Sequence, residues 1–237
     1  LPPDALRAMK PDQFSAMPPM AFAGFKPAQI DVMPPSVFSA MAPEQLNAMP
    51  PSVFKVMDPK QVQSLPPTAV AGFSPNQVGQ LPPAAFAAFK PTQMDALPPA
   101  AFAGFKPAQL DVLPPAVFRV LDANQVETLP PTAFKVIDAK QFGALPPTAM
   151  EGLTPGQVKQ VPPGVLASSL NAGNVGSLDP ETFAGMTNKQ LGGLKPTVAK
   201  GVENEQLDAL SAGQAKALPK PFVNALTSTQ KGILLGM

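Results

Sequence analysis

The sequence predicts an all-α solenoid of very short helices, built from an eight-residue repeat. A hydrophobic residue returns every eight positions from Leu1 to Val161, and after one inserted residue the register resumes at Leu170 and continues to Leu234. Proline follows nearly every return, and glutamine marks every second octad. Because a motif repeated in this way specifies a shape, an architectural role is favoured over a catalytic one.

Proline at position 3 of the octad predicts where each helix begins. It occupies this position in 19 of the first 21 octads, the exceptions being Ala123 and Ala139. Proline is favoured at the first helical residue, where its missing N–H has no partner to lose. Position 2 is then the N-cap, and the hydrophobic residues at positions 1 and 6 form a hydrophobic staple. We therefore expect Leu97 to pack on Phe102 inside the fold.

Glutamine at position 5 predicts a capping box in alternate octads. Position 5 is the third residue of the helix, where a glutamine oxygen can accept the backbone N–H of the N-cap residue. These octads keep a residue with an N–H at position 2, whereas the intervening octads have proline there. The alternative is that the glutamines form a regular row that binds a lattice such as ice or a polysaccharide. The glutamines are Gln13, Gln29, Gln45, Gln61, Gln77, Gln93, Gln109, Gln125, Gln141 and Gln157.

The repeat excludes a continuous helix and an ordinary strand. Eight residues advance a helix about 80° beyond two full turns, so its apolar stripe would leave any single face, and proline would break it. In a strand, positions 1 and 6 would lie on opposite faces. Short helices that stack remain, and alternation of two octad types makes the unit 16 residues. We predict two helices per coil, although four would satisfy the same alternation, in a rod on the order of 130 Å long.

Small residues at position 8, such as Gly72 and Gly104, predict a close approach between successive coils. The repeat is regular over residues 1–168 and degenerate over residues 169–237, where proline holds position 3 only at Pro180 and Pro196. We expect the second region to continue the same solenoid as a capping or transition segment, with packing that becomes less regular.

Composition excludes several classes of function. The chain is 45% hydrophobic and 14% charged, which favours a folded protein over a disordered one. Its 17 basic and 16 acidic residues are spread evenly, so nucleic acid is not an expected partner. The chain has no His and no Cys, which removes the usual zinc ligands and the usual general base. We expect no enzyme activity, no cofactor, and no catalytic, cofactor-binding or metal-binding residue.

Two groups of side chains, the methionines and the carboxylates, were considered as metal-binding sites. Six methionines at position 1 have a spacing that is simply that of the core, so we interpret them as core residues rather than as a soft-metal site. The carboxylates are single and scattered, without a calcium loop, and we interpret them as solvated. The methionines are Met9, Met17, Met33, Met41, Met49 and Met57.

No apolar stretch approaches the ~20 residues of a membrane span, because proline or a charge interrupts every octad. The sequence starts at Leu1 without an initiator methionine or a signal-like segment, so we expect a fragment of a longer chain. The absence of cysteine does not decide the compartment.

Two strings carry a resemblance to a known kind of repeat. Residues 97–110, LPPAAFAGFKPAQL, and residues 145–158, LPPTAMEGLTPGQV, are similar to the proline-rich octapeptide repeats (PPEAFAGLTPEQ-like) of large secreted or cell-surface proteins. The resemblance covers residues 1–168 well and the remainder loosely. Glutamate at position 4 is rare here, with Glu44 one match, so acidic calcium-dependent behaviour is not carried over. The resemblance implies an elongated extracellular or cell-surface stalk.

The sequence thus favours a structural spacer or stalk of a larger extracellular or surface protein or filament. Its partners would be neighbouring domains of the same long chain or like subunits. The alternative is an adhesin-like solenoid that binds a protein or a glycan, which would need an exposed position with non-random side chains along several coils. An enzyme would need a polar cluster that breaks the repeat, and the break at residues 168–171 contains no base.

Overall fold

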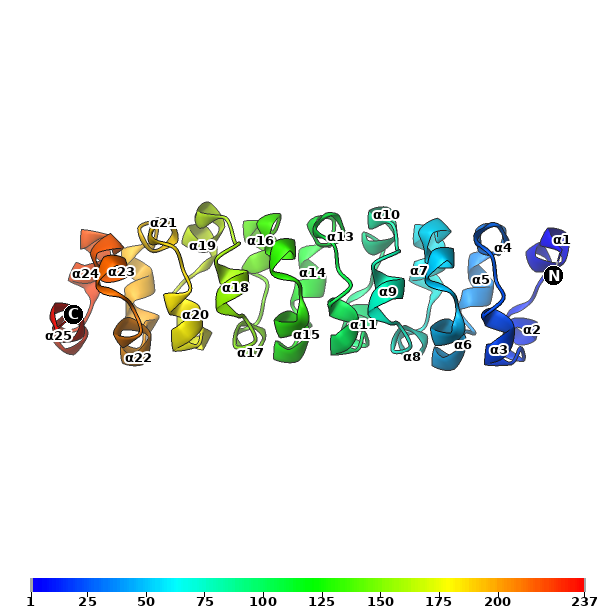
Figure 1. Cartoon of the computed structure of the whole chain (residues 1–237), viewed down its shortest axis with the longest axis horizontal. Coiled ribbons are helices and arrows are strands. Elements are labelled where there is room, and N and C mark those ends of the chain that lie inside the picture. The colour runs from blue at the N-terminus through cyan, green and yellow to red at the C-terminus, as the bar shows by residue number, and fades with distance from the viewer. Residues whose placement is uncertain (1, 237) are drawn as a thin grey trace. The chain divides into compact units, whose positions relative to one another are not determined.

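The computed structural model describes residues 2–236, which are helical or irregular and contain no strand. Each octad of the described chain holds one short helix (Figure 1). In all 21 octads before the insertion, the helix begins at position 3, including those where Ala123 and Ala139 replace proline. The predicted all-α solenoid of very short helices, with one helix in each eight-residue repeat, is therefore confirmed.

The chain divides into two compact units, which we describe separately. Unit 1 comprises Leu1–Val120 and Thr128–Pro130, and unit 2 comprises Leu121–Glu127 and Pro131–Met237. The compositional change at residue 168 lies inside unit 2. The helices of unit 1 are α1 (Pro3–Arg7), α2 (Pro11–Ser15), α3 (Pro19–Phe22), α4 (Pro27–Asp31), α5 (Pro35–Phe38), α6 (Pro43–Ala48), η1 (Pro51–Val56), α7 (Pro59–Ser64), α8 (Pro67–Val70), α9 (Pro75–Val78), α10 (Pro83–Phe86), α11 (Pro91–Asp95), α12 (Pro99–Phe102), α13 (Pro107–Asp111) and α14 (Pro115–Phe118).

Unit 2 continues the same pattern of one helix per octad through the degenerate region. Its helices are α15 (Ala123–Thr128), η2 (Pro131–Lys135), α16 (Ala139–Phe142), α17 (Pro147–Met150), α18 (Pro155–Val158), α19 (Pro163–Ser169), η3 (Val175–Ser177), α20 (Pro180–Ala184), α21 (Asn188–Leu191), η4 (Pro196–Gly201), α22 (Asn204–Asp208), α23 (Ala212–Ala217), α24 (Lys220–Ala225) and α25 (Ser228–Leu235). The labels η mark 3₁₀ helices.

Within each unit, a helix packs on the third helix before it and the third after it along the chain. In unit 1, for example, α3, α6, α8 and α11 follow one another in a row (Figure 1). Side-chain hydrogen bonds between successive coils join residues 28 to 32 positions apart. One coil therefore takes between three and four octads, and the expected two helices per coil is wrong. Helices with glutamine at position 5, which we call glutamine-type helices, alternate along the regular repeat with helices that follow two prolines, which we call proline-proline helices. Since the third helix along the chain is always of the other type, a glutamine-type helix packs on proline-proline helices.

The core is formed by the side chains at positions 1 and 6, together with apolar residues at position 5 such as Val53 and Ala101. At position 6, every residue from Leu6 to Leu166 is at most 1% exposed. Aromatic rings meet inside this core: Phe102 stacks on Phe105 with 5.1 Å between ring centroids. The predicted inward face is confirmed, and both Leu97 and Phe102 are buried. The position-1 methionines from Met33 to Met57 are buried in the same core, whereas Met9 and Met17 are half-buried.

Glycine at position 8 lets two coils approach each other closely. A Cβ atom added to Gly104 would lie 2.0 Å from the carbonyl oxygen of Pro75, and one added to Gly72 would lie 2.2 Å from that of Pro43. Among the described glycines none has a positive φ, so the backbone conformation does not require glycine at these positions. Glycine is needed here because there is no space for a side chain. The close approach of successive coils that the small residues at position 8 predicted is therefore confirmed.

The degenerate region keeps hydrogen bonds between successive coils. The inserted residue is absorbed by α19, which extends to Ser169, and the hydroxyl of Ser169 donates to the carbonyl oxygen of Ala139, 3.0 Å away in the preceding coil. Farther along, Gln206 is buried and bonded to the preceding coil. Contacts between coils therefore survive the loss of proline. The packing is nevertheless less regular in places, because η3 has only three residues and α23 has no buried residue.

Candidate functional site

A glutamine at position 5 makes two different connections with one side chain. In Gln77 the amide oxygen accepts the backbone N–H of the N-cap residue Ser74 at 2.9 Å. The amide nitrogen donates to the carbonyl oxygens of Leu46 at 2.9 Å and Met49 at 2.8 Å, both in the preceding coil. The same side chain therefore caps its own helix and binds that helix to the coil before it.

This double connection recurs along both units, and we name the set the glutamine ladder. Its side chains are buried except for Gln214, which is half-buried; Gln61, Gln93 and Gln109, for example, are each 1% exposed. In the described part of the chain, no buried side-chain nitrogen or oxygen lacks a partner. The ladder comprises Gln45, Gln61, Gln77, Gln93 and Gln109 in unit 1 and Gln157, Gln190, Gln206, Gln214 and Gln230 in unit 2.

The burial of the ladder corrects one hypothesis and extends another. A glutamine row that binds ice or a polysaccharide is wrong for the ladder of unit 1, because its amides lie inside the fold and bond to the main chain. The capping box is confirmed, but the bond to the preceding coil was missed. A signal for it was present: a capping box accepts glutamate as readily as glutamine, yet all ten alternate octads carry glutamine, which alone has an N–H to donate.

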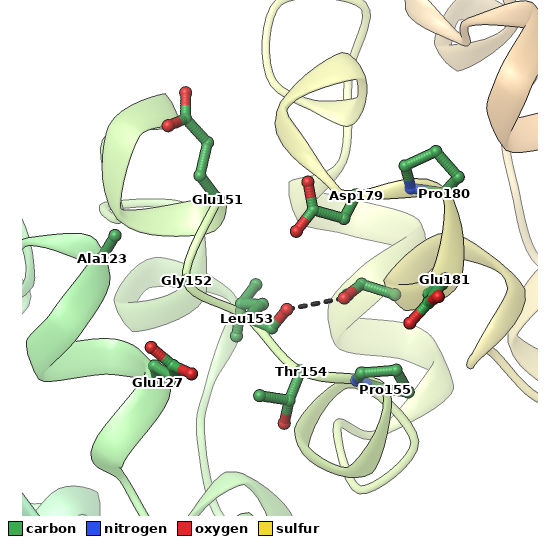
Figure 2. Close-up of a pocket in the computed structure, with 11 residues that line it drawn as sticks. Ala123, Glu127, Glu151, Gly152, Leu153, Thr154, Pro155, Asp179, Pro180 and Glu181 are labelled. Atoms are coloured by element: carbon green, nitrogen blue, oxygen red, sulfur yellow. Dashed lines mark hydrogen bonds between the residues drawn. The ribbon is translucent and has the colours of Figure 1, made fainter.

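A cleft of about 610 Å³ opens on the surface of unit 2. It lies between α15, the segment that links α17 to α18, and the beginning of α20 (Figure 2). Across it, the hydroxyl of Thr182 donates to the carbonyl oxygen of Leu153 at 2.6 Å. The residues that line it are Ala123, Glu127, Glu151, Gly152, Leu153, Thr154, Pro155, Asp179, Pro180, Glu181 and Thr182.

The repeat explains why a cleft forms there. Gly152 at position 8 brings the main chain against α15, where an added Cβ would lie 2.0 Å from the carbonyl oxygen of Ala123. The same octad positions line a cleft of about 330 Å³ beside Gly72 in unit 1 and one of about 490 Å³ beside Gly185 in unit 2. Clefts of this kind are therefore a regular feature of the coil surface.

Charge distinguishes the first cleft from the other two. Four carboxylates line it, and Figure 2 shows Glu127 and Glu151 on one side of Leu153 with Asp179 and Glu181 on the other. The cleft beside Gly72 has a single acidic residue, and that beside Gly185 has a lysine. No group of three or more acidic side chains among residues 2–236 is arranged to hold a metal ion. The cleft offers oxygen acceptors to a cationic group.

In the sequence these four carboxylates are scattered, and the expectation was that they are solvated. Glu127 and Asp179 are more than 50 positions apart in the sequence and line one cleft only because successive coils stack. To predict the cleft, one would need to know how many residues make up one coil, and the eight-residue periodicity does not give that number.

No protein-family model matches the chain, and none of the curated proteins matches its sequence. One solved structure that aligns with it is the leucine-rich repeat-containing protein LegL7 from Legionella pneumophila. That alignment covers 97% of this chain and 95% of the other, with 12% identity and a TM-score of 0.15, and at this score it carries no argument about fold or function. No helix within residues 2–236 is long and apolar enough to cross a membrane.

Proposed function

We propose that the chain is a structural module, a spacer or stalk segment of a larger extracellular or cell-surface protein or filament. The glutamine ladder supports this proposal most strongly. Each ladder glutamine joins the first turn of one helix to the main chain of the preceding coil, and every one of these side chains except Gln214 is buried. Repeated links of one geometry hold the spacing of the coils constant, which is the property that a spacer requires.

The types of residue that are buried in the repeat support the same proposal. Most buried positions are occupied by aliphatic residues, phenylalanine, methionine or glutamine, which pack in the core or bond to the main chain. The partners of such a module would be neighbouring domains of the same polypeptide or like subunits, which continue the stack.

Solution scattering and circular dichroism test this proposal. We expect a helical spectrum and a radius of gyration well above the ~17–18 Å of a compact domain of this length. A compact particle, or a β-type spectrum, would contradict a spacer. Surface labelling of intact source cells with an antibody to the chain tests the compartment, and labelling only after the cells are opened would exclude an extracellular stalk.

The acidic cleft of unit 2 favours a second candidate, a module that binds a protein. The cleft matches the clefts beside Gly72 and Gly185 in position but is larger, and four carboxylates line it. A partner segment rich in lysine or arginine would complement that charge, and the attraction would weaken as salt is added.

Binding of a fluorescent lysine-rich peptide tests this candidate. The chain is compared with a variant that carries Glu127→Gln, Glu151→Gln, Asp179→Asn and Glu181→Gln. A matched control removes four charges elsewhere on unit 2, through Glu203→Gln, Glu205→Gln and Asp208→Asn together with the exposed Asp138→Asn. Loss of binding in the cleft variant alone supports the candidate, whereas equal binding by both variants would exclude it.

A further inference from the structure

Two aspartates of the chain are followed directly by proline, and only one of them caps its helix. The Asp58–Pro59 bond opens α7, and the carboxylate of Asp58 accepts the backbone N–H of Gln61 at 2.8 Å. The Asp179–Pro180 bond opens α20, and the side chain of Asp179 makes no such cap. Both aspartates are exposed to solvent, so the cap is what distinguishes them.

Asp179 stands where a proline-proline helix has proline. α20 has Thr182 at position 5 in place of glutamine, whereas Asp58 and Asp138 cap glutamine-type helices. The backbone of Asp179 has φ −53°, which is closer to the −67° of Pro82 at position 2 of α10 than to the −85° of Asp58. With no N–H to hold it, the carboxylate of Asp179 is free to turn toward the carbonyl carbon of its own residue.

We propose that the folded chain cleaves itself at the Asp179–Pro180 bond in acid and leaves the Asp58–Pro59 bond intact. An oxygen of the Asp179 carboxylate attacks the carbonyl carbon of the same residue and forms a five-membered cyclic anhydride. The bond to the nitrogen of Pro180 breaks, and that nitrogen takes up a proton and leaves as an amine. Water then opens the anhydride, which gives Asp179 its side-chain carboxyl and a new terminal carboxyl. One water molecule is consumed, and the polypeptide is cut inside unit 2.

The surroundings of the bond favour this reaction. The carbonyl oxygen of Asp179 accepts the backbone N–H of Phe183 at 2.9 Å, which polarises the carbonyl group under attack. The bond lies at the acidic cleft of unit 2, whose carboxyl groups are proton donors for the nitrogen of Pro180 once the solution is acidic (Figure 2). α20 packs on α18, which has no charged residue, and on α22, which adds two acidic ones. The acidic residues of the cleft and of α22 are Glu127, Glu151, Glu181, Glu205 and Asp208.

Incubation at about pH 4, where a carboxyl group of ordinary acidity is present in both its forms, tests the proposal. Mass spectrometry under denaturing conditions measures the fragments, including those that stay together in the stack. Fragments 1–179 and 180–237 should accumulate. Fragments 1–58 and 59–237 should form roughly ten times more slowly or less, because Asp58 must first give up the hydrogen bond to its carboxylate. In guanidinium chloride at the same pH, where neither aspartate is held, the two bonds should break at similar rates.

Two variants show whether the residues act as proposed. Pro180→Ala replaces the proline nitrogen that leaves, and the fold should tolerate it, because alanine already begins α15 and α16 at the same octad position. Asp179→Glu keeps the charge but would need a six-membered ring. Both variants should keep the helical circular-dichroism signal and lose the cut after residue 179.

The rate constant of the natural chain should not change with protein concentration, because the reaction lies within one residue, whereas a contaminating protease would act faster in more concentrated samples. Equal rates at the two bonds in the folded chain, an uncut chain, the same fragments from Pro180→Ala, or cleavage only after the helical signal is lost would overturn the proposal. The structural function does not depend on this result, since scattering of the uncut chain at neutral pH tests it separately.

Discussion

The side-chain nitrogen of Gln77 lies 2.9 Å from the carbonyl oxygen of Leu46, a residue 31 positions earlier in the chain. Gln77 belongs to a helix of four residues, which is too short to be stable alone. The same amide nitrogen also bonds to the carbonyl oxygen of Met49, which is followed by Pro50 and Pro51, two residues without an N–H. The glutamine therefore supplies, from the next coil, donors that this part of the main chain lacks.

Gly104→Ala should destabilise unit 1 by about 1–3 kcal/mol, because its Cβ would overlap the carbonyl oxygen of Pro75 at 2.0 Å and force two coils apart. The measurement is urea unfolding followed by circular dichroism. Gly164→Ala places a methyl group in open space within α19 and should leave the unfolding midpoint unchanged or raise it slightly, because alanine favours a helix more than glycine does. Equal midpoints for the two variants would mean that the coils do not touch at position 8.

Phe102→Ala should cost about 3–5 kcal/mol, because it removes a ring that is 1% exposed and stacked on Phe105. Thermal unfolding of purified protein measures the loss. Met20→Ala is a suitable control, since the Met20 side chain is 86% exposed. An unfolding curve of Phe102→Ala that overlays the natural one would show that position 6 does not form the core.

Deletion of residues 97–104 should destabilise the chain more than deletion of residues 97–112. The shorter deletion removes one octad, so glutamine-type helices would pack on glutamine-type helices across the joint. Gln109, which now bonds to Val78 and Leu81, would then face a different part of the preceding coil. The longer deletion removes two octads and preserves the alternation. Denaturant unfolding compares the two variants, and equal stability per residue would mean that the coil accepts octads in any order.

Much of the fold could be predicted because the residue types at fixed octad positions determine where each helix begins and which side chains are buried. Proline at position 3 predicts each helix start, and the hydrophobic residues at positions 1 and 6 predict the inward face. The number of octads in a coil could not be predicted, because it depends on the angle between consecutive helices, which periodicity does not encode. The acidic cleft was missed for the same reason, since the length of one coil decides that Glu127 and Asp179 line the same cleft.

Gln77→Glu removes the bond from a ladder glutamine to the preceding coil and keeps its cap. Glutamate keeps the oxygen that caps Ser74 but has no amide to donate to Leu46 and Met49. Because buried carbonyl groups lose their donor and a carboxylate replaces a neutral amide, urea unfolding should show a loss of about 2–4 kcal/mol. Gln13→Glu is the matched control, since the exposed Gln13 caps Lys10 in the same way and should tolerate the change. Two variants that unfold at the same urea concentration as the natural chain would contradict the ladder.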